Sequence, residues 1–341
     1  MSDIAKELNI STNTVSVALR NKSGVSSATR EWIIKTATDM GYLSASNITT
    51  PNILIVSDYA ANLQNDQFAH ALFAQLDIDL RNSLCNTMVE YNINSCAPAF
   101  LEEIIYSKKI NGIIIIDEID INLVKVIADM GIPFITSGTY YPTVPGDSVM
   151  DDNINAMVLI GNHLAENGYT QIGFIGPYNL NKSFAERWMG FNYSMKLYSL
   201  SIHNDWMHVD AMYSDYCNVD FIAEKVFSDS LPEVFVCMND RIGVTCVKAL
   251  AKLGIRVPDD IGVIGFDNSD FAKLCIPTLT TIQNSQILQS QELVRKLLDR
   301  IKNPQKVPGR SVSPIEIVIG DSTRKLDPRS SQKLVIDTKT E

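Results

Sequence analysis

Short apolar runs alternate with helical segments from residue 53 to about residue 320, and no other feature of the chain restricts its fold as strongly. ILIVSD at 53–58 and GIIIID at 112–117 are continuous apolar runs that end in an acid, as expected of strands buried on both faces. Between such runs lie segments long enough for three or more helical turns. Alternation of this kind favours a parallel sheet with helices on both faces.

The alternation occurs in two series. The first predicts strands at 53–58, 87–92, 112–117 and 132–138, and helices at 68–82, 98–107 and 122–130. After a turn-rich segment at 142–147, the second predicts helices at 153–167, 183–197, 218–228 and 241–253, and strands at 171–176, 206–211, 233–240 and 261–268. A strand at 279–282, a helix at 285–301 and a strand at 315–319 follow. We therefore expect an α/β body of two parallel-sheet lobes with a cleft between them, and a tail that crosses back between the lobes.

The first 42 residues have a different, all-helical pattern. Helices are expected at 3–8, 12–19 and 27–40, with Ser2 and Ser11 as caps of the first two. Two short helices joined by so tight a turn form a helix-turn-helix, in which the start of the second helix enters the major groove. Thr12 and Asn13 are the best-placed base readers. The third helix should cover the back of this pair with Trp32, Ile33, Ala37 and Met40, and Gly41 should end it. A small helical bundle without a nucleic-acid role is the alternative.

Charge is divided unevenly between the two parts. The chain carries a formal net charge of −10, yet residues 1–50 hold five basic and four acidic side chains, a net of +1, which leaves −11 for the rest. A weakly basic head on an acidic body is consistent with a protein that contacts DNA at one end.

The sequence also indicates where in the cell the protein is located. No apolar run is long enough to span a bilayer, and the N-terminus lacks the order of a signal peptide, so we expect a soluble, cytoplasmic protein. The 6 cysteines form no C-x-x-C pair and the 4 histidines no ligand spacing, so we expect reduced thiols, no metal and no cofactor.

The head resembles the DNA-binding domain of the lactose-repressor and galactose-repressor family of bacterial transcription regulators. The family's patterns S-x-x-T-V-S-x-x-L, G-V-S-x-x-T-R and the closing G-Y are legible between Ser11 and Tyr42. One departure is Val17, because the family usually has a long polar or basic residue there; a contact would become apolar, for example against a thymine methyl. The DNA-binding residues that follow from the pattern and the resemblance are Ser11, Thr12, Asn13, Thr14, Ser16, Val17, Arg20, Lys22 and Thr29.

The predicted strands of the body end in polar residues, and in open parallel sheets ligands bind beyond these carboxyl ends. They are Ser57, Asp58, Asp117, Ser137, Asp152, Asn153, Asn239, Asp240, Asp267 and Asn268. For any single one, the alternative is that it caps the following helix.

The body resembles the sugar-binding core of the same family, which is itself akin to periplasmic sugar-binding proteins. H-L-x-x-x-G-Y-x-x-I-x-F-I-G at 163–176, R-x-x-G-F at 187–191 and D-I-x-V-x-G-F-D-N at 260–268 carry the resemblance. It implies effector contacts at Arg187, Asn239, Asp240 and Asp267, with Asp58, Phe68 and Asp152 in the pocket wall. An aromatic ring for the sugar is expected near Met212, from Trp206 or Tyr213.

These features predict a domain order of head (1–42), linker (43–52), two-lobed effector-binding and dimerisation domain (53–325) and disordered tail (326–341). We expect the protein to be a homodimeric transcription repressor. It would bind operator DNA under the control of a small sugar or sugar derivative. A free sugar-binding protein without a DNA role is the alternative. An enzyme is disfavoured, because G-x-S-x-G, H-E-x-x-H, a phosphate loop and G-x-G-x-x-G are all missing from the sequence.

The linker departs from the family, in which a hinge helix before the body orders on DNA and inserts a leucine into the minor groove. Only ten residues, 43–52, separate Tyr42 from Ile53, and they are rich in Ser, Asn and Thr, which compete with helix formation. We therefore predict an operator complex with little or no central kink, measurable by FRET between the DNA ends. A strong central bend that Leu43→Ala or Ile48→Ala removes would contradict this prediction.

Overall fold

The structure, a computed structural model, describes residues 2–19, 25–39, 50–58, 67–227 and 230–324. It divides into two compact units, Met1–Pro51 and Asn52–Glu341. The expectations for the linker, for Met40 and Gly41 and for the tail beyond residue 325 lie outside the described residues and stay predictions. Within the described part, no helix is both long and apolar enough to cross a membrane.

The head contains, among its described residues, the helices α1 (Ser2–Glu7), α2 (Thr12–Leu19) and α3 (Ser27–Asp39). Ile4, Val15, Ile33 and Ala37 are fully buried and form its core with Ala5, Leu8 and Ala18. Trp32 was predicted to cover this core but is half exposed, because Ile33 and Ala37 already occupy the inward face of α3.

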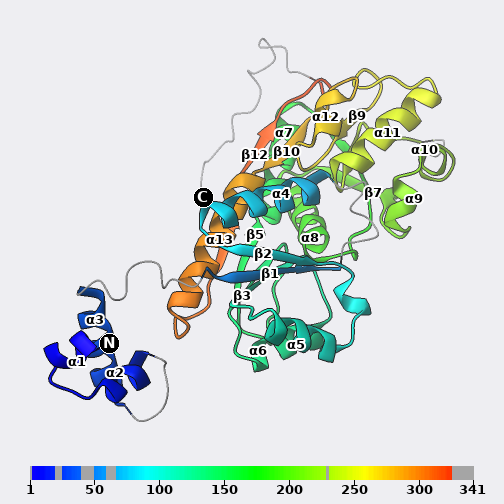
Figure 1. The fold of residues 1–341 in the computed structure, drawn as a ribbon. Coiled ribbons are helices and arrows are strands. Elements are labelled where there is room, and N and C mark those ends of the chain that lie inside the picture. Colours follow the sequence, from blue (N-terminus) through cyan, green and yellow to red (C-terminus); the bar gives the residue numbers. More distant parts are fainter. Residues whose placement is uncertain (1, 20–24, 40–49, 59–66, 228–229, 325–341) are drawn as a thin grey trace. The chain divides into compact units, whose positions relative to one another are not determined.

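The first lobe of the body is a six-stranded parallel sheet in the order β11-β5-β4-β3-β1-β2 (Figure 1). Its strands are β1 (Asn52–Ser57), β2 (Asn86–Glu90), β3 (Gly112–Ile116), β4 (Phe134–Ser137), β5 (Asp147–Asp151) and β11 (Arg310–Ser313). Its helices are α4 (Gln67–Asn82), α5 (Pro98–Ser107), α6 (Ile121–Asp129) and α13 (Gln286–Lys302), with a short 3-10 turn, η3 (Ile93–Ser95).

The isoleucines of β3 show why this sheet needs both helical layers. Ile113 and Ile115 pack in one core with side chains of α5 and α6, whereas Ile114 and Ile116 pack in another with side chains of α4 and α13. All four are buried, because successive side chains of a strand point to opposite faces and both faces are covered.

The second lobe has a four-stranded parallel sheet in the order β7-β6-β8-β9 and an antiparallel pair, β10-β12. The strands are β6 (Gln171–Ile175), β7 (Ser201–His208), β8 (Val234–Cys237), β9 (Gly262–Ile264), β10 (Thr281–Asn284) and β12 (Ile315–Val318). The helices are α7 (Asn153–Glu166), α8 (Lys182–Leu197), α9 (Tyr213–Tyr216), α10 (Val219–Phe221), the π-helix η4 (Ile222–Val226), α11 (Asp240–Lys252) and α12 (Asp270–Leu274).

The chain crosses between the lobes at three described places. It leaves the first lobe between β5 and α7, returns between β10 and α13, and leaves again between β11 and β12, where Pro314 separates the strands. The predicted return of the tail is therefore confirmed.

Several elements differ from the sequence prediction. β5 and β11 were missed, because each is short and lies next to a Pro- and Gly-containing turn that hides its pattern. The helix expected at 218–228 is instead divided into α10 and η4, and α9 and α12 were not anticipated.

A buried ion pair fastens β5 to α13 in the first lobe. Nε of Arg300 lies 2.9 Å from Oδ2 of Asp147, and the backbone N–H of Gly309 donates to Oδ1 of the same carboxylate at 2.8 Å. Both side chains are about nine-tenths buried or more. Arg300 also donates to the carbonyls of Pro304 and Lys306, so the pair fixes the turn that leads into β11.

We predict that Asp147→Ala lowers the free energy of unfolding of the body by about 3–5 kcal/mol, because it leaves the buried Arg300 without its counter-ion. Asp77→Ala is the matched control, since Asp77 pairs with Arg81 at 2.9 Å on the surface of α4 and such pairs contribute about 0–1 kcal/mol. Urea unfolding measures both, and equal losses would contradict the assignment.

Candidate functional site

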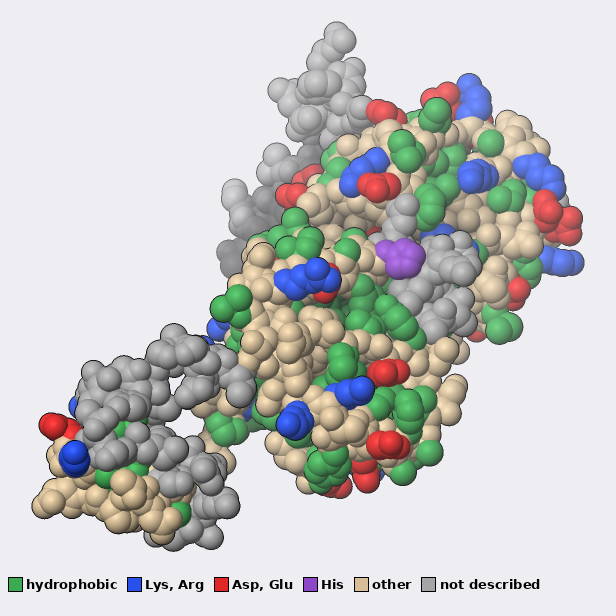
Figure 2. Space-filling model, in the orientation of Figure 1, with side chains coloured by type: hydrophobic (Ala, Val, Ile, Leu, Met, Phe, Trp, Pro, Cys, Tyr) green, Lys and Arg blue, Asp and Glu red, His purple; other side chains and the backbone are tan. Residues whose placement is uncertain are grey.

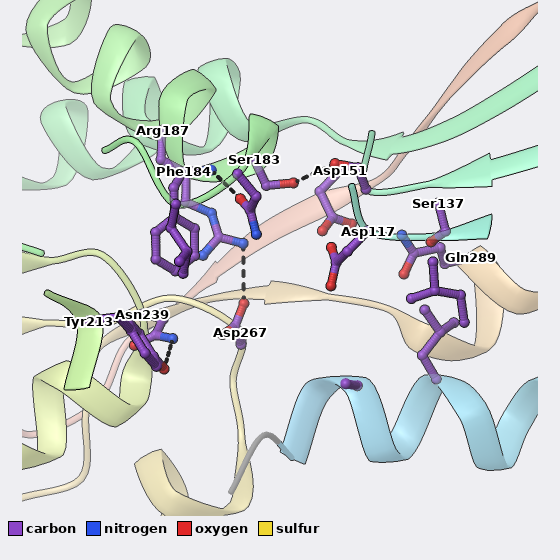
Figure 3. A pocket seen from close by; sticks show the side chains of 16 residues that line it. Asp117, Ser137, Asp151, Ser183, Phe184, Arg187, Tyr213, Asn239, Asp267 and Gln289 are labelled. Carbon is purple, nitrogen blue, oxygen red and sulfur yellow. Dashed lines mark hydrogen bonds and ion pairs between the residues drawn. The ribbon is translucent and has the colours of Figure 1, made fainter. Parts of the chain in front are cut away.

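A cleft lies between the two lobes, at the carboxyl ends of the strands of both parallel sheets. The space between its side chains amounts to about 660 Å³, part of it open to solvent. The polar and aromatic side chains around it are Asp117, Ser137, Asp151 and Gln289 from the first lobe, and Ser183, Phe184, Arg187, Tyr213, Asn239 and Asp267 from the second (Figure 3). Three of the predicted effector residues, Arg187, Asn239 and Asp267, are thus brought together.

Arg187 occupies the centre of the second-lobe wall and is 5% exposed. Its guanidinium donates to Oδ1 of Asn153 at 3.0 Å and to the carbonyl of Met238 at 3.0 Å, and it pairs with Oδ1 of Asp267 at 3.3 Å. The group also lies 3.5 Å from the centroid of the Phe266 ring. A buried guanidinium is stable only with such partners, so its position is fixed before any ligand enters.

The loop after β9 holds Asp267 in a conformation that non-glycine residues rarely adopt. Its φ is +111°, and that of Asn268 is +48°. The loop is fixed by its neighbours: the N–H of Asp267 donates to the carbonyl of Ile282, and the N–H of Ser269 donates to Oδ2 of Asp240 at 2.7 Å. Such strain persists only where the surroundings determine it, and it is concentrated at ligand sites.

Asn239 and Tyr213 form the next part of the wall. Oδ1 of Asn239 accepts from the N–H of Ile242 and caps α11, and its amide donates to the hydroxyl of Tyr213 at 2.9 Å. The rings of Tyr213 and Phe184 lie 6.0 Å apart, so the expected aromatic surface is present. Trp206 donates to the carbonyl of Ser230 and is not part of the cleft lining.

Two residues of the first-lobe wall were not predicted. Asp151 is 5% exposed, and its Oδ2 accepts from Asn284 at 3.0 Å. Burial raises the pKa of Asp151, and the charge of Arg187 offsets part of that rise. Gln289, 1% exposed, belongs to the inward stripe of α13 with Leu293 and Leu297. An amide on an otherwise apolar helical stripe is the sequence signal that could have identified it.

Three of the other predicted effector residues, Asp58, Asp152 and Asp240, have other described contacts and are not part of the described cleft lining. Asp152 caps α7 through the N–H of Asn155, and Asp58 accepts from the N–H of Asn94. Asp240 is 1% exposed and accepts from the hydroxyl of Thr281 at 2.6 Å. Burial raises its pKa to about 6. The side chain of Phe68 lies outside the described part of the structure.

Direct contacts join the lobes across the cleft. The hydroxyl of Ser183, on α8, donates to the carbonyl of Gly138 in the first lobe at 3.2 Å. Asn153, the first residue of α7 after the crossing, donates to the carbonyl of Asp151 and to Oε2 of Glu186 while it accepts from Arg187. The guanidinium is therefore connected to one of the crossings by a single side chain. Among the described residues, no group of three or more His, Cys, Asp or Glu side chains could hold a metal ion.

The second candidate site is the outer face of α2 in the head. Oγ of Ser11 accepts from the N–H of Thr14 at 3.0 Å, as predicted for its cap. Ser11, Thr12 and Asn13 are exposed, while Thr14 and Val17 are half-buried. Thr29 lies at the start of α3, where its hydroxyl contacts that of Ser26. Arg20, Lys22 and the side chain of Ser16 lie outside the described residues.

Arg30 fixes the angle between α2 and α3. It donates from α3 to the carbonyl of Ala18, near the end of α2, at 2.8 Å. A basic side chain there satisfies a carbonyl that has no partner within its own helix. The exposed N-terminal turn of α2 is thus presented on a fixed support, which is the geometry that major-groove reading requires.

Comparisons with known proteins match both the head and the body. Residues 1–44 match the family model "Bacterial regulatory proteins, lacI family", and residues 162–323 match a "Periplasmic binding protein-like domain". The chain is 24% identical to the HTH-type transcriptional repressor PurR of Photobacterium profundum, over 89% of this chain and 92% of that protein.

Solved structures show the same fold. The transcriptional regulator CelR in complex with cellobiose has a TM-score of 0.68 and 20% identity, covering 94% of this chain and 98% of that one. The lac repressor dimer bound to operator and an anti-inducer has a TM-score of 0.67 and 20% identity, with the same shares of each chain. A free binding protein would leave the head without a role. The chain therefore joins a DNA-binding head of the lacI family to a periplasmic-binding-protein-like body, as in the repressors to which it is similar, and it is a DNA-binding transcription regulator, not an enzyme.

Proposed function

We propose that this protein represses transcription as a cytoplasmic homodimer on a near-palindromic operator, and that a small carbohydrate-like effector in the cleft sets its affinity for DNA. The observation that carries the proposal is Arg187, which is buried at the cleft and bound to both Asp267 and Asn153. A ligand that contacts this guanidinium would also affect the segment in which the chain crosses between the lobes, because Asn153 in that segment accepts a hydrogen bond from Arg187.

The chemistry of the cleft suits a polyol. Arg187 and the amide of Asn239 can donate to ligand hydroxyls, and Asp117 and Asp267 can accept from them. Phe184 and Tyr213 offer ring faces against which the C–H face of a sugar can pack. The regulator CelR, which has the same fold, was solved with cellobiose. These features together support a carbohydrate over a purely apolar ligand.

Control of DNA binding would follow from closure of the cleft. Ser183 and Gly138 hold the lobes together at one point, and a ligand that contacts both walls would stabilise that arrangement. A ligand shifts a conformational equilibrium only through its different affinity for the two states. Rotation of the first lobes would then change the distance between the two heads of a dimer.

Exposed apolar side chains on the body support dimerisation. Leu274, the last residue of α12, is 80% exposed, and Ile276, two residues later, is 91% exposed. Ile78 and Leu84, at α4 and the turn after it, are also exposed. One reading helix covers too few bases for a specific site, and two heads double that number. The related lac repressor was solved as a dimer bound to operator.

The DNA contacts are assigned to the head and not to the body. On the face shown in Figure 2, acidic and basic side chains of the body are interspersed and form no continuous basic surface. The body therefore offers little attraction for phosphates on this face, and Thr12 and Asn13 are the proposed base readers.

We predict that Asn13→Ala weakens binding to an operator selected from random duplexes by about 1–3 kcal/mol, because Asn13 reads a base edge from the start of α2. Binding to scrambled DNA should be nearly unchanged. Glu7→Gln, an exposed change on α1, is the control and should preserve the ratio of specific to non-specific affinity. Fluorescence anisotropy measures both, and an unchanged ratio in Asn13→Ala would remove this residue from the contacts.

A second prediction concerns Arg187→Lys, which keeps a positive charge beside Asp267 but loses the planar set of donors. Operator binding without effector should remain normal, whereas the response to the sugar found by a thermal-shift screen should be lost. Arg295→Lys, on the exposed face of α13, is the matched control. A normal sugar response in Arg187→Lys would mean that the effector binds elsewhere.

A further inference from the structure

Two buried acceptor atoms on the first-lobe wall of the cleft have no hydrogen-bond partner among the described residues. They are Oδ1 of Asp151, at the end of β5, and Oε1 of Gln289, in the first turn of α13. Both residues line the cleft, and Figure 3 shows them across from Arg187 and Asn239. An unpaired buried acceptor raises the free energy of the protein, so a ligand that brings a donor to these atoms removes that cost.

The cleft also carries an excess of negative charge. Asp117, Asp151 and Asp267 line it, whereas Arg187 is the single cationic side chain among the described lining residues. That cation is already paired with Asp267. Glu186 adds a further negative charge near Asp151. A ligand that carries positive charge would therefore balance the first-lobe wall as well as satisfy its acceptors.

An ammonium group fits both requirements better than a hydroxyl. A hydroxyl donates one hydrogen bond and brings no charge, whereas an ammonium donates three and brings a full positive charge. Hydrogen bonds between charged partners are about twice as strong as neutral ones. The second-lobe wall differs, because Arg187 and Asn239 present donors that suit hydroxyl oxygens.

Resting on the proposed carbohydrate effector, we propose that the effector is an amine-bearing polyol, of the amino-sugar class. Its ammonium group binds Oδ1 of Asp151 and Oε1 of Gln289, and its hydroxyls face Arg187 and Asn239. The two walls of the cleft then recognise opposite ends of one ligand.

The test compares matched sugars by titration calorimetry on the full-length protein. The probes are glucosamine, galactosamine and mannosamine, each with its neutral parent sugar and its N-acetyl form. In the wild type, at least one free amine should bind about ten- to a hundredfold more tightly than both of its neutral counterparts.

Amino-acid substitutions test whether the ammonium group binds at Asp151 and Gln289. Asp151→Asn has the same shape and can still accept from Asn284, but it presents an amide to the cleft in place of a carboxylate. We expect it to reduce the advantage of the amine to about twofold or less. Asp152→Asn is the control, since an asparagine can still cap α7, and it should keep the advantage. Gln289→Leu tests the second acceptor independently, in case Asp151→Asn folds poorly. We expect it to weaken binding of the free amine more than binding of the parent sugar.

The outcomes separate the two proposals. Neutral sugars that bind as tightly as their amines would overturn the amine assignment and leave the carbohydrate effector in place. An amine advantage that survives both Asp151→Asn and Gln289→Leu would overturn the assignment of these atoms. Failure of all nine sugars to bind would reject the carbohydrate effector and the amine with it.

Discussion

A guanidinium group removed from water must have its charge balanced and its donors satisfied, and the cleft of this protein is built around that requirement at Arg187. The three acceptors come from three different segments: Asn153 after the first crossing, Met238 after β8, and Asp267 after β9. The strained loop at Asp267 is the backbone arrangement that brings its carboxylate to this position. Removal of Asp267 would leave the buried charge without its ion-pair partner, and removal of Asn153 would leave one of its donors unpaired.

The sequence predicted the fold well where hydrophobic periodicity was strong. β3 and α5 were located almost to the residue, because an uninterrupted isoleucine run and a Pro-initiated amphipathic helix have few alternatives. β5 and β11 were missed, since each depends on a neighbouring strand for its hydrogen bonds and carries little periodicity of its own. Parallel pairing of β11 with β5 joins residues more than 150 positions apart, which local patterns cannot reveal.

The same limitation applies at the candidate site. β5 was not foreseen, and Asp152 was expected in the pocket wall, whereas β5 ends at Asp151 and Asp151 lines the cleft. Successive side chains at a strand end point to opposite sides. Asp240 follows a strand as expected, but its carboxylate accepts from the N–H of Ser269 and is not part of the described cleft lining. Arg187, Asn239 and Asp267, which specific motifs indicated, do line the cleft, and their contact with an effector stays a prediction.

The three crossings mean that neither lobe is a continuous stretch of chain. The sheet of the first lobe ends with β11, and α13 is one of the two helices that cover Ile114 and Ile116. Both β11 and α13 are synthesised after almost the entire second lobe. Until residue 313 has left the ribosome, the first 150 residues have an unpaired edge at β5, and the apolar face that α13 will cover is packed only by α4. The first lobe can therefore complete its sheet and its second helical layer only after most of the second lobe has been synthesised.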